Sequence, residues 1–482
     1  MYRFLNKFFL LLFSCSANVI FAQNPFKSIK YNVQTGGIIA TKKNIPFFLH
    51  SNSFGTIPFQ SNSAFMASSL FKQYDSLYTT SSKLKKFGYG YGLNVHTNLS
   101  SKSQFLLPEF FIKIRFGGIE IYGGRRKEIQ GLVDTTLSSG AYIVSGNALP
   151  IPKIQISTPN WLGFGKYKRF SINTGLSHGW FGNQGIIENY FLHQKWLYFR
   201  VSDKRKKVQL SGGANHQTQW GGYSEVLKSI DGYDNPTING YLAPYPLYSY
   251  KYILIPFLQK IVSANPQKVP LYDAALAIGN QLGSVDLQVI YNSNFSFYHQ
   301  KPFDFARSLI NFNNLEDGIY GVSWISKNTK KIVSRLVGEF IYTKSQGLYR
   351  FGKNRPSNKG ENDNYFSHGQ YQTWTYQQRI IGTPFILVDT EKNMIVNNRL
   401  KGFYVATEGK LNSYNFTIKA THSINYGTYS SPVLVKSNSF LIKINRPVFS
   451  GLRLNLYLAQ DFGELYPNSF GILFGFSKDF IK

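Results

Sequence analysis

The chain has 482 residues, of which 43% are hydrophobic and 17% aromatic, whereas charged residues make up only 16%. This composition departs from that of ordinary soluble domains, in which about 25% of residues are charged. The 53 lysines and arginines against 24 acidic residues give a net charge of +29, which would attract an anionic partner such as nucleic acid, lipid A phosphates or an acidic polysaccharide.

The first residues predict export. Arg3 and Lys7 precede an apolar run over 8–13, and Ala22 offers a small residue at a plausible cleavage point. This pattern is typical of a secretory signal peptide over residues 1–22, cleaved to leave 23–482 as the mature chain. Export excludes nucleic acid as the main partner. The sole cysteine, Cys15, lies in the signal peptide, so we expect no disulfide in the mature chain.

Period-two alternation dominates the rest of the chain. In the segment 87–99, FGYGYGLNVHTNL, the odd positions are mostly aromatic or apolar and the even positions carry glycine, asparagine and histidine. Such alternation predicts a β-strand, whose side chains point to opposite faces in turn. It recurs without an intervening helical pattern over 110–116, 170–180, 208–220, 452–459 and 470–480.

Two all-β architectures produce this pattern, a soluble sandwich and a transmembrane barrel. The polar faces here carry Gly, Ser, Asn and Gln with isolated cations such as Lys113 and Arg115, whereas a solvated sandwich face is usually richer in Lys and Glu. The aromatic rows suit the girdles at membrane interfaces. After Gln23 no apolar run approaches the ~20 residues of a spanning helix. We therefore predict a barrel in the outer membrane of a Gram-negative cell, with aromatic side chains toward lipid and glycines and amides toward the lumen.

Length limits the number of strands and the possible partners. At ~9–11 residues per strand plus turns and loops, about 460 mature residues fit an even count near 16 to 18 antiparallel strands. The stretches 231–236, 292–314 and 353–360 are predicted extracellular loops. The aromatic alternation over 470–480 resembles the closing strand by which the barrel-insertion machinery recognises its clients. We expect a monomer in contact with outer-membrane lipids, including lipopolysaccharide.

The sequence offers little that predicts catalysis. Its 8 histidines show no metal-binding spacing, and no cofactor motif is present, so we expect neither. His216 and Thr218 share a strand face, but Thr218 is a poor substitute for the serine of an outer-membrane hydrolase, and a polar pair within the wall is the simpler interpretation. The carboxylates Glu225, Asp231, Glu339 and Asp363 lack a recognisable glycosidase spacing. We expect no enzyme activity.

Carbohydrate binding requires aromatic faces for sugar rings and amides or arginines for hydroxyls and carboxylates. Membrane-interface girdles, lumen lining and loop packing use the same residue types, so these alternatives stay open. The candidate polysaccharide-binding residues are Arg125, Arg126, Gln217, Gln219, Trp220, Tyr223, Tyr371, Trp374, Tyr376 and Arg379.

Five ordered stretches carry a family resemblance. They are PFFLHSNSFG (46–55), SGNALPIPKI (145–154), LHQKWLY (192–198), NHQTQWGG (215–222), and DNYFSHG (363–369) continuing to 385. Together they make the chain resemble the capsule assembly Wzi family of outer-membrane proteins, in its Bacteroidetes-like form. The match is weak from Leu227 to Lys330.

The resemblance implies an 18-stranded barrel closed by loops folded into the lumen, with a small helical part on the periplasmic side. It also implies a lectin-like protein that attaches exported capsular polysaccharide to the cell surface without catalysis or transport. Two alternatives remain. One is an anion-selective, porin-like transport barrel with Lys113 and Arg115 lining its lumen. The other is an outer-membrane hydrolase centred on His216.

Overall fold

The computed structural model describes residues 29–74, 87–230, 235–255, 267–270, 273, 278–304, 314–328, 331–347, 363–449 and 451–481. The predicted signal peptide, the loop 353–360 and most of the loop 231–236 lie outside these residues. No helix of the described chain is long and apolar enough to cross a membrane.

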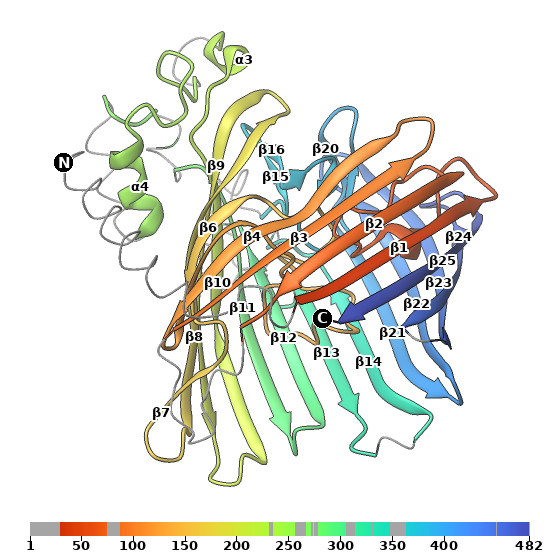
Figure 1. Ribbon diagram of the computed structural model, residues 1–482. Coiled ribbons are helices and arrows are strands. Elements are labelled where there is room, and N and C mark those ends of the chain that lie inside the picture. The colour runs from red at the N-terminus through yellow and green to blue at the C-terminus, as the bar shows by residue number, and fades with distance from the viewer. Residues whose placement is uncertain are drawn as a thin grey trace.

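Eighteen antiparallel strands close into one barrel, as the sequence predicted (Figure 1). One of them is split, because β6 and β7 pair in succession with β8. The barrel closes where β1 pairs with β25, from Lys30 opposite Ile481 to Ala40 opposite Gly471. The strands are β1 Ile29–Ala40, β2 Ser63–Lys72, β3 Phe87–Leu99, β4 Gln104–Phe116, β5 Ile119–Arg125, β6 Lys153–Ser157, β7 Leu162–Phe164, β8 Phe170–Gln184, β9 Ile187–Ser202, β10 Val208–Trp220, β11 Asn280–Tyr291, β12 Phe295–Phe303, β13 Gly318–Ile325, β14 Val333–Tyr342, β21 Leu400–Leu411, β22 Tyr414–Gly427, β23 Pro432–Phe449, β24 Leu452–Gly463 and β25 Ser469–Ile481.

The two faces of the wall follow the alternation in the sequence. On β3 the apolar positions point outward, and Leu99 keeps 57% of its surface exposed. The glycines point into the barrel, where a Cβ on Gly90 would lie 2.6 Å from the carbonyl oxygen of Lys72 and 2.8 Å from the Lys113 side chain. Phe474 and Phe476 on β25 are likewise exposed. An apolar outer face around a polar lumen is the arrangement of an outer-membrane barrel.

The connections differ between the two ends of the barrel. The four longest connections all lie at the end opposite the termini; they are 41–62, 126–152, 221–279 and 343–399. Because outer-membrane barrels have short periplasmic turns and longer extracellular loops, we take this as the outer end. The helices α2 (Phe47–His50), α3 (Glu225–Lys228) and α4 (Pro246–Leu254) lie in these connections. These helices of the described chain are therefore at the outer end, whereas the family resemblance places a helical part at the periplasmic end.

The predicted loop 292–314 is wrong over residues 292–303, which form a three-residue turn at the inner end followed by β12 from Phe295. The rest of the stretch begins the outer connection between β12 and β13, and residues 305–313 lie outside the described residues. The sequence of β12, FSFYHQKPF, places Tyr298 and Gln300 on the lumen face, where both are buried. An aromatic residue on the inner face obscures the alternation between apolar and polar positions, which is why the strand was assigned to a loop.

Three connections fold into the lumen, as predicted, and together form what we call the plug: residues 41–62, 126–152 and 363–399. The plug contains α2 and three two-stranded sheets, β15 (Ser367–His368) with β16 (Gln372–Thr373), β17 (Thr375–Tyr376) with β18 (Arg379–Ile380), and β19 (Leu387–Asp389) with β20 (Met394–Asn397). One cluster of buried apolar side chains joins all three segments to inward residues of strands around the barrel, including Ile38, Leu282, Tyr404 and Leu473. The described part of the lumen thus has a packed core across its middle.

Candidate functional site

The wall holds the plug through inward-pointing acceptors. Asp286 on β11 accepts the backbone N–H of Leu132 at 2.9 Å, and Glu339 on β14 accepts that of Ser139 at 2.8 Å. Further around the barrel, Asp461 of β24 accepts the N–H of Phe47 at 2.8 Å. A carboxylate that accepts from a backbone N–H makes a strong hydrogen bond and satisfies a donor that burial would leave unpaired.

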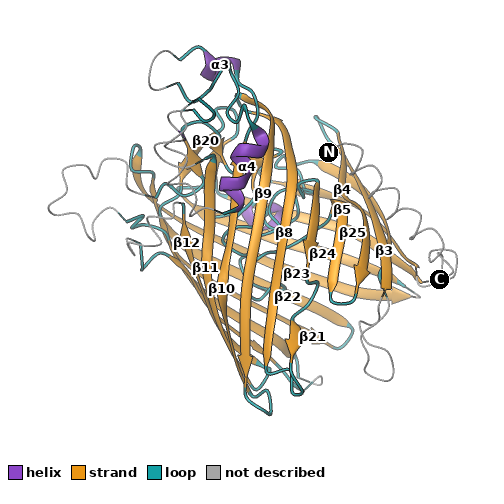
Figure 2. Ribbon diagram, turned by 90° about the vertical axis from the view of Figure 1, so that its left-hand side faces the viewer, coloured by secondary structure: helices purple, strands orange, loops and turns teal. Residues whose placement is uncertain are grey.

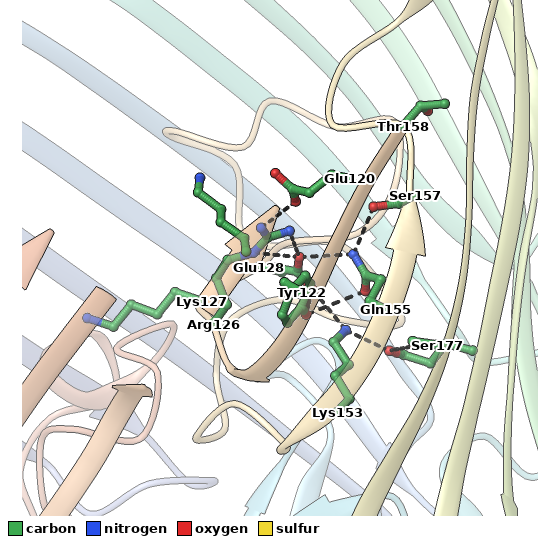
Figure 3. Close-up of polar contacts among 12 residues, drawn as sticks. Glu120, Tyr122, Arg126, Lys127, Glu128, Lys153, Gln155, Ser157, Thr158 and Ser177 are labelled. Carbon is green, nitrogen blue, oxygen red and sulfur yellow. Dashed lines mark hydrogen bonds and ion pairs between the residues drawn. The ribbon is translucent and has the colours of Figure 1, made fainter. Parts of the chain in front are cut away.

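A charged network fixes the start of the plug segment 126–152 against β5 and β6 (Figure 3). The guanidinium of Arg126 bonds the carboxylates of Glu120 and Glu128, each at 2.5 Å. Glu128 also pairs with Lys153 of β6 at 2.8 Å and accepts the Tyr122 hydroxyl at 2.9 Å. Burial alone would raise the pKa of Glu128, but the positive charges of Lys153 and Arg126 hold this pKa at about 2. The pKa of Arg126 rises because Glu128, Tyr122 and Glu120 favour its charged form.

Arg125, Tyr376 and Arg379, three predicted binding residues, join the plug segments to each other and to the wall. Arg125 at the end of β5 donates to the Tyr376 hydroxyl at 2.7 Å. Arg379 donates to the carbonyl oxygen of Ile57, and its guanidinium lies 3.9 Å from the centre of the Phe59 ring. The structure therefore gives these side chains a packing role, and a ligand contact stays a prediction.

Gln217, Gln219, Tyr371 and Trp374 are also buried between wall and plug. Gln219 donates to the carbonyl oxygen of Thr373 at 3.1 Å. The Tyr371 hydroxyl donates to the carbonyl oxygen of Gly221 at 3.1 Å, and the side-chain oxygen of Gln217 accepts from the amide of Gln194 at 2.9 Å. Trp374 keeps 1% of its surface exposed within the apolar cluster. The plug thus brings together most of the predicted residues, but in its interior.

His368 illustrates how the plug is ordered locally. Its Nδ1 accepts the backbone N–H of Gln370 at 3.1 Å, inside the hairpin of β15 and β16. Burial lowers the pKa of His368 to about 4, so the imidazole is neutral at pH 7 and can serve as an acceptor.

Helix α4 covers the outer surface of β9, above the exposed apolar band of that strand (Figure 2). Trp220 of β10 points outward and packs against Tyr250 of α4, with ring centres 5.4 Å apart. Lys195 of β9 donates to the carbonyl oxygens of Ile253 and Leu254 at the end of the helix, at 2.5 and 3.1 Å. Lysine at a helix C-terminus satisfies carbonyls that have no intrahelical partner. Trp220 is therefore part of an outer-wall cluster rather than of the lumen.

The predicted hydrolase centre has no catalytic geometry in the described chain. His216 bonds Gln281 at 3.3 Å and stacks on Phe303, and it makes no hydrogen bond with Thr218. Of the four candidate carboxylates, Glu339 anchors the plug and Asp363 accepts from Asn314 at 2.6 Å inside it. Glu225 is exposed, and Asp231 lies outside the described residues. Among the described ranges, no three His, Cys, Asp or Glu side chains group as a metal site.

The exposed candidate for ligand contact lies on connection 221–279, and we call it the tyrosine platform: Tyr223, Tyr241 and Tyr245. Tyr241 and Tyr245 keep 53% and 50% of their surfaces exposed, and the rings of Tyr223 and Tyr241 are 5.1 Å apart. The Tyr223 hydroxyl donates to Glu225, which Lys228 neutralises at 3.0 Å. The sequence analysis predicted only Tyr223 as a binding residue. The tyrosine-rich run GYLAPYPLYSYKY over 240–252 is the feature that could have indicated Tyr241 and Tyr245.

Comparison with known proteins finds only distant structural likenesses. No family model matches the chain, and no curated protein does. Among solved structures, OccD3 of Pseudomonas aeruginosa is 8% identical, with a TM-score of 0.34 over 95% of this chain and 92% of that one. OccK5 of the same species is 7% identical, with a TM-score of 0.41 over 94% and 98%. A BenF-like porin from Pseudomonas fluorescens Pf-5 is 8% identical, with a TM-score of 0.41 over 94% and 98%. These distant likenesses leave the function to the geometry, and the fold is that of an outer-membrane β-barrel.

Proposed function

We propose that this barrel attaches an acidic polysaccharide to the outer surface of the cell, without catalysis and without free passage through the lumen. The observation that carries the proposal is an exposed tyrosine platform at the outer end of a barrel whose described lumen is packed by its own connections. The resemblance to capsule assembly proteins and the net charge of +29 point the same way.

The platform has the chemistry that a sugar chain requires. Tyrosine rings present flat apolar faces that cover the C–H faces of sugar rings, while their hydroxyls bond to the edges. Lys251 of α4, on the same connection as the platform, is exposed and is available for a carboxylate or phosphate of the polymer. The charge of Glu225 does not repel such a group, because Lys228 and the Tyr223 hydroxyl already engage it.

The test compares the triple variant Tyr223→Ala, Tyr241→Ala, Tyr245→Ala with a control, Tyr167→Ala, whose side chain is 59% exposed at the opposite end of the barrel. Cells with the triple variant should make a normal amount of polymer but release more of it into the medium, and purified variant should retain less polymer from the same organism. Normal retention by the triple variant, or an equal loss with the control, would contradict the proposal.

The second candidate is an anion-selective, porin-like barrel. Inward cations of the inner half favour it: Lys113 and Arg115 on β4, as predicted from the sequence, and Lys419 and Lys443 on the far wall. Cations along a lumen select anions. Single-channel recording in a planar bilayer separates the candidates. Steady anion-selective conductance of the intact chain would support a porin, whereas conductance that arises only after residues 130–144 are replaced by a short linker would support attachment.

A further inference from the structure

A cavity of about 300 Å³ lies on the inner side of the plug, opposite the tyrosine platform. The plug segment 126–132 forms one side of it, and β6, β8 and β9 form the other. Its lining includes Trp161, Trp196 and Asn173. Asn173 follows closely on the short turn 165–169, which lies at the same end as the termini. The cavity therefore belongs to the periplasmic half of the lumen.

The cavity combines aromatic and amide groups in fixed positions. The indole N–H of Trp196 donates to the side-chain oxygen of Asn173 at 2.8 Å, which fixes both side chains. Gly175 makes room for this indole, since a Cβ there would lie 2.2 Å from the Trp196 ring. Gln155 and Ser157 add an amide and a hydroxyl to the lining. Aromatic faces beside preorganised amides and hydroxyls suit a sugar ring.

Behind the cavity lining, Arg200 contacts Trp161 and carries a positive charge that has no acidic partner among the described residues. The guanidinium of Arg200 lies 3.8 Å from the centre of the Trp161 ring. Its Nε donates to Ser211 at 2.8 Å and its Nη2 reaches Gln288 at 3.4 Å. Among the residues that the structure describes, no carboxylate lies within ion-pair distance of Arg200.

The neighbouring network does not supply that missing charge. Its cations Arg126 and Lys153 are matched by Glu120 and Glu128, so the group has no surplus of either sign. Arg200 therefore remains an uncompensated charge, and guanidinium groups bind carboxylates strongly.

We propose that this cavity binds one acidic sugar unit, a hexuronate, presented from the periplasmic side. Trp161 and Trp196 contact the ring, Asn173 and Gln155 bond its hydroxyls, and Arg200 pairs with its carboxylate. The inference rests on the proposed function for the class of ligand, but it places a second contact with the polymer on the other side of the plug. The barrel would then engage the chain at both faces of the membrane.

The test uses the purified full chain in detergent micelles and a glucuronate-containing disaccharide, with the disaccharide of glucose as its neutral counterpart. Binding is measured by calorimetry and by tryptophan fluorescence. Arg200→Gln should weaken binding of the acidic disaccharide about tenfold and leave binding of the neutral one unchanged, because only the charge pair is lost. Trp161→Ala should weaken both.

Two matched controls and a folding check accompany these variants. Arg205→Gln changes an arginine in the turn that follows β9, and Trp180→Ala changes an outward tryptophan on β8; both should bind like the parent chain. Heat-dependent migration in gels shows that each variant is a folded barrel. If the parent chain does not bind the acidic disaccharide at about 1 mM, or if Arg200→Gln binds it equally well, the inference is wrong.

The triple platform variant separates this inference from the proposed function. It should keep binding of the disaccharide while it loses surface polymer. If it loses the disaccharide as well, the binding site is at the platform and the inner cavity is not a sugar site. If surface polymer is retained normally but Arg200 is still required for the disaccharide, the attachment proposal fails and the cavity assignment stands.

Discussion

Replacing Glu128 by glutamine should loosen the plug without unfolding the barrel. Glu128 accepts from Arg126 at 2.5 Å, from Lys153 at 2.8 Å and from Tyr122 at 2.9 Å. The variant Glu128→Gln keeps the size of the side chain but removes the negative charge between two cations, leaving them partly unpaired. Breaking one partner of a buried ion pair typically costs 3–5 kcal/mol.

The pKa of Glu128 gives an independent value for the free energy that its ion pairs contribute. A pKa of about 2, against 4.5 for an ordinary glutamate, corresponds to about 3 kcal/mol at 1.36 kcal/mol per unit. Because the folded state lowers this pKa, the stabilisation is complete above about pH 4.5 and is lost as the pH falls toward 2. At pH 7 the variant should therefore lose roughly 3 kcal/mol of local stability, or about two orders of magnitude in the opening equilibrium.

Hydrogen exchange of the segment 126–152 measures that equilibrium directly. The N–H of Gln130, which bonds the carbonyl oxygen of Val144 at 3.1 Å, should exchange about a hundredfold faster in Glu128→Gln at pH 7, and the difference should disappear toward pH 2. The control Glu225→Gln, which changes an exposed carboxylate that contacts Tyr223, should leave the segment unchanged. Equal protection of Gln130 in parent and Glu128→Gln at pH 7 would refute the assignment of this network as the anchor.

Three further changes test other parts of the structure. Gly175→Ala should lower the unfolding temperature, because its Cβ would clash with the indole of Trp196. Gly123→Ala has open space around its Cβ and should leave the unfolding temperature unchanged. Equal effects of the two variants would contradict the packing of Trp196 against Gly175. The pKa of His368 is lowered to about 4, so its protonation should loosen the β15–β16 hairpin as the pH falls from 6.5 toward 4, measured as faster hydrogen exchange. In His368→Asn the stability of the hairpin should no longer depend on pH over this range. If the variant keeps the pH dependence of the parent chain, His368 is not its cause. Leu456→Arg, on the outward face of β24, should destabilise the barrel in lipid vesicles by about 2–4 kcal/mol. Asn455→Arg, on the lumen face, should destabilise it much less. The reverse order would contradict the assignment of the two faces.

The wall was predictable from the sequence because its physics is local. Successive side chains of a strand point to opposite sides, so the alternation over 87–99 already separates the lipid face from the lumen face. The same rule placed Lys113 and Arg115 in the lumen, where both are buried. The chain length restricted the strand count to about 16 to 18, since each crossing of the membrane requires a nearly fixed number of residues, and the family resemblance implied 18.

The plug was not predictable at the level of residues, because its contacts join segments far apart in the chain. Tyr371 and Trp374 have the composition of a sugar site, and no periodicity shows that they are buried. The bond between Arg125 and Tyr376 links positions 251 residues apart. The aromatic residues that do reach solvent at the outer end, Tyr241 and Tyr245, lie in the part of the chain where the family resemblance is weakest.

The anchoring of the plug also bears on whether the barrel transports solutes. Ejecting the plug would break, together, the bonds that Asp286, Glu339 and Asp461 accept from its backbone and the bond between Gln300 and the N–H of Tyr142 at 2.8 Å. Water would replace these partners, so the loss is the net worth of each bond, about 1.5–3 kcal/mol for each of the three bonds to a carboxylate and about 0.5–1.5 kcal/mol for the bond to the amide. The cost is roughly 5–10 kcal/mol, comparable to the stability of a whole domain. Gating by ejection would therefore have to be driven by a ligand of comparable binding energy, and a transported solute would instead have to pass beside a fixed plug. The proposed attachment function requires only that the plug stays in place, whereas a porin also requires an open path beside it, which is why the conductance of the intact chain is the decisive measurement between the two functions.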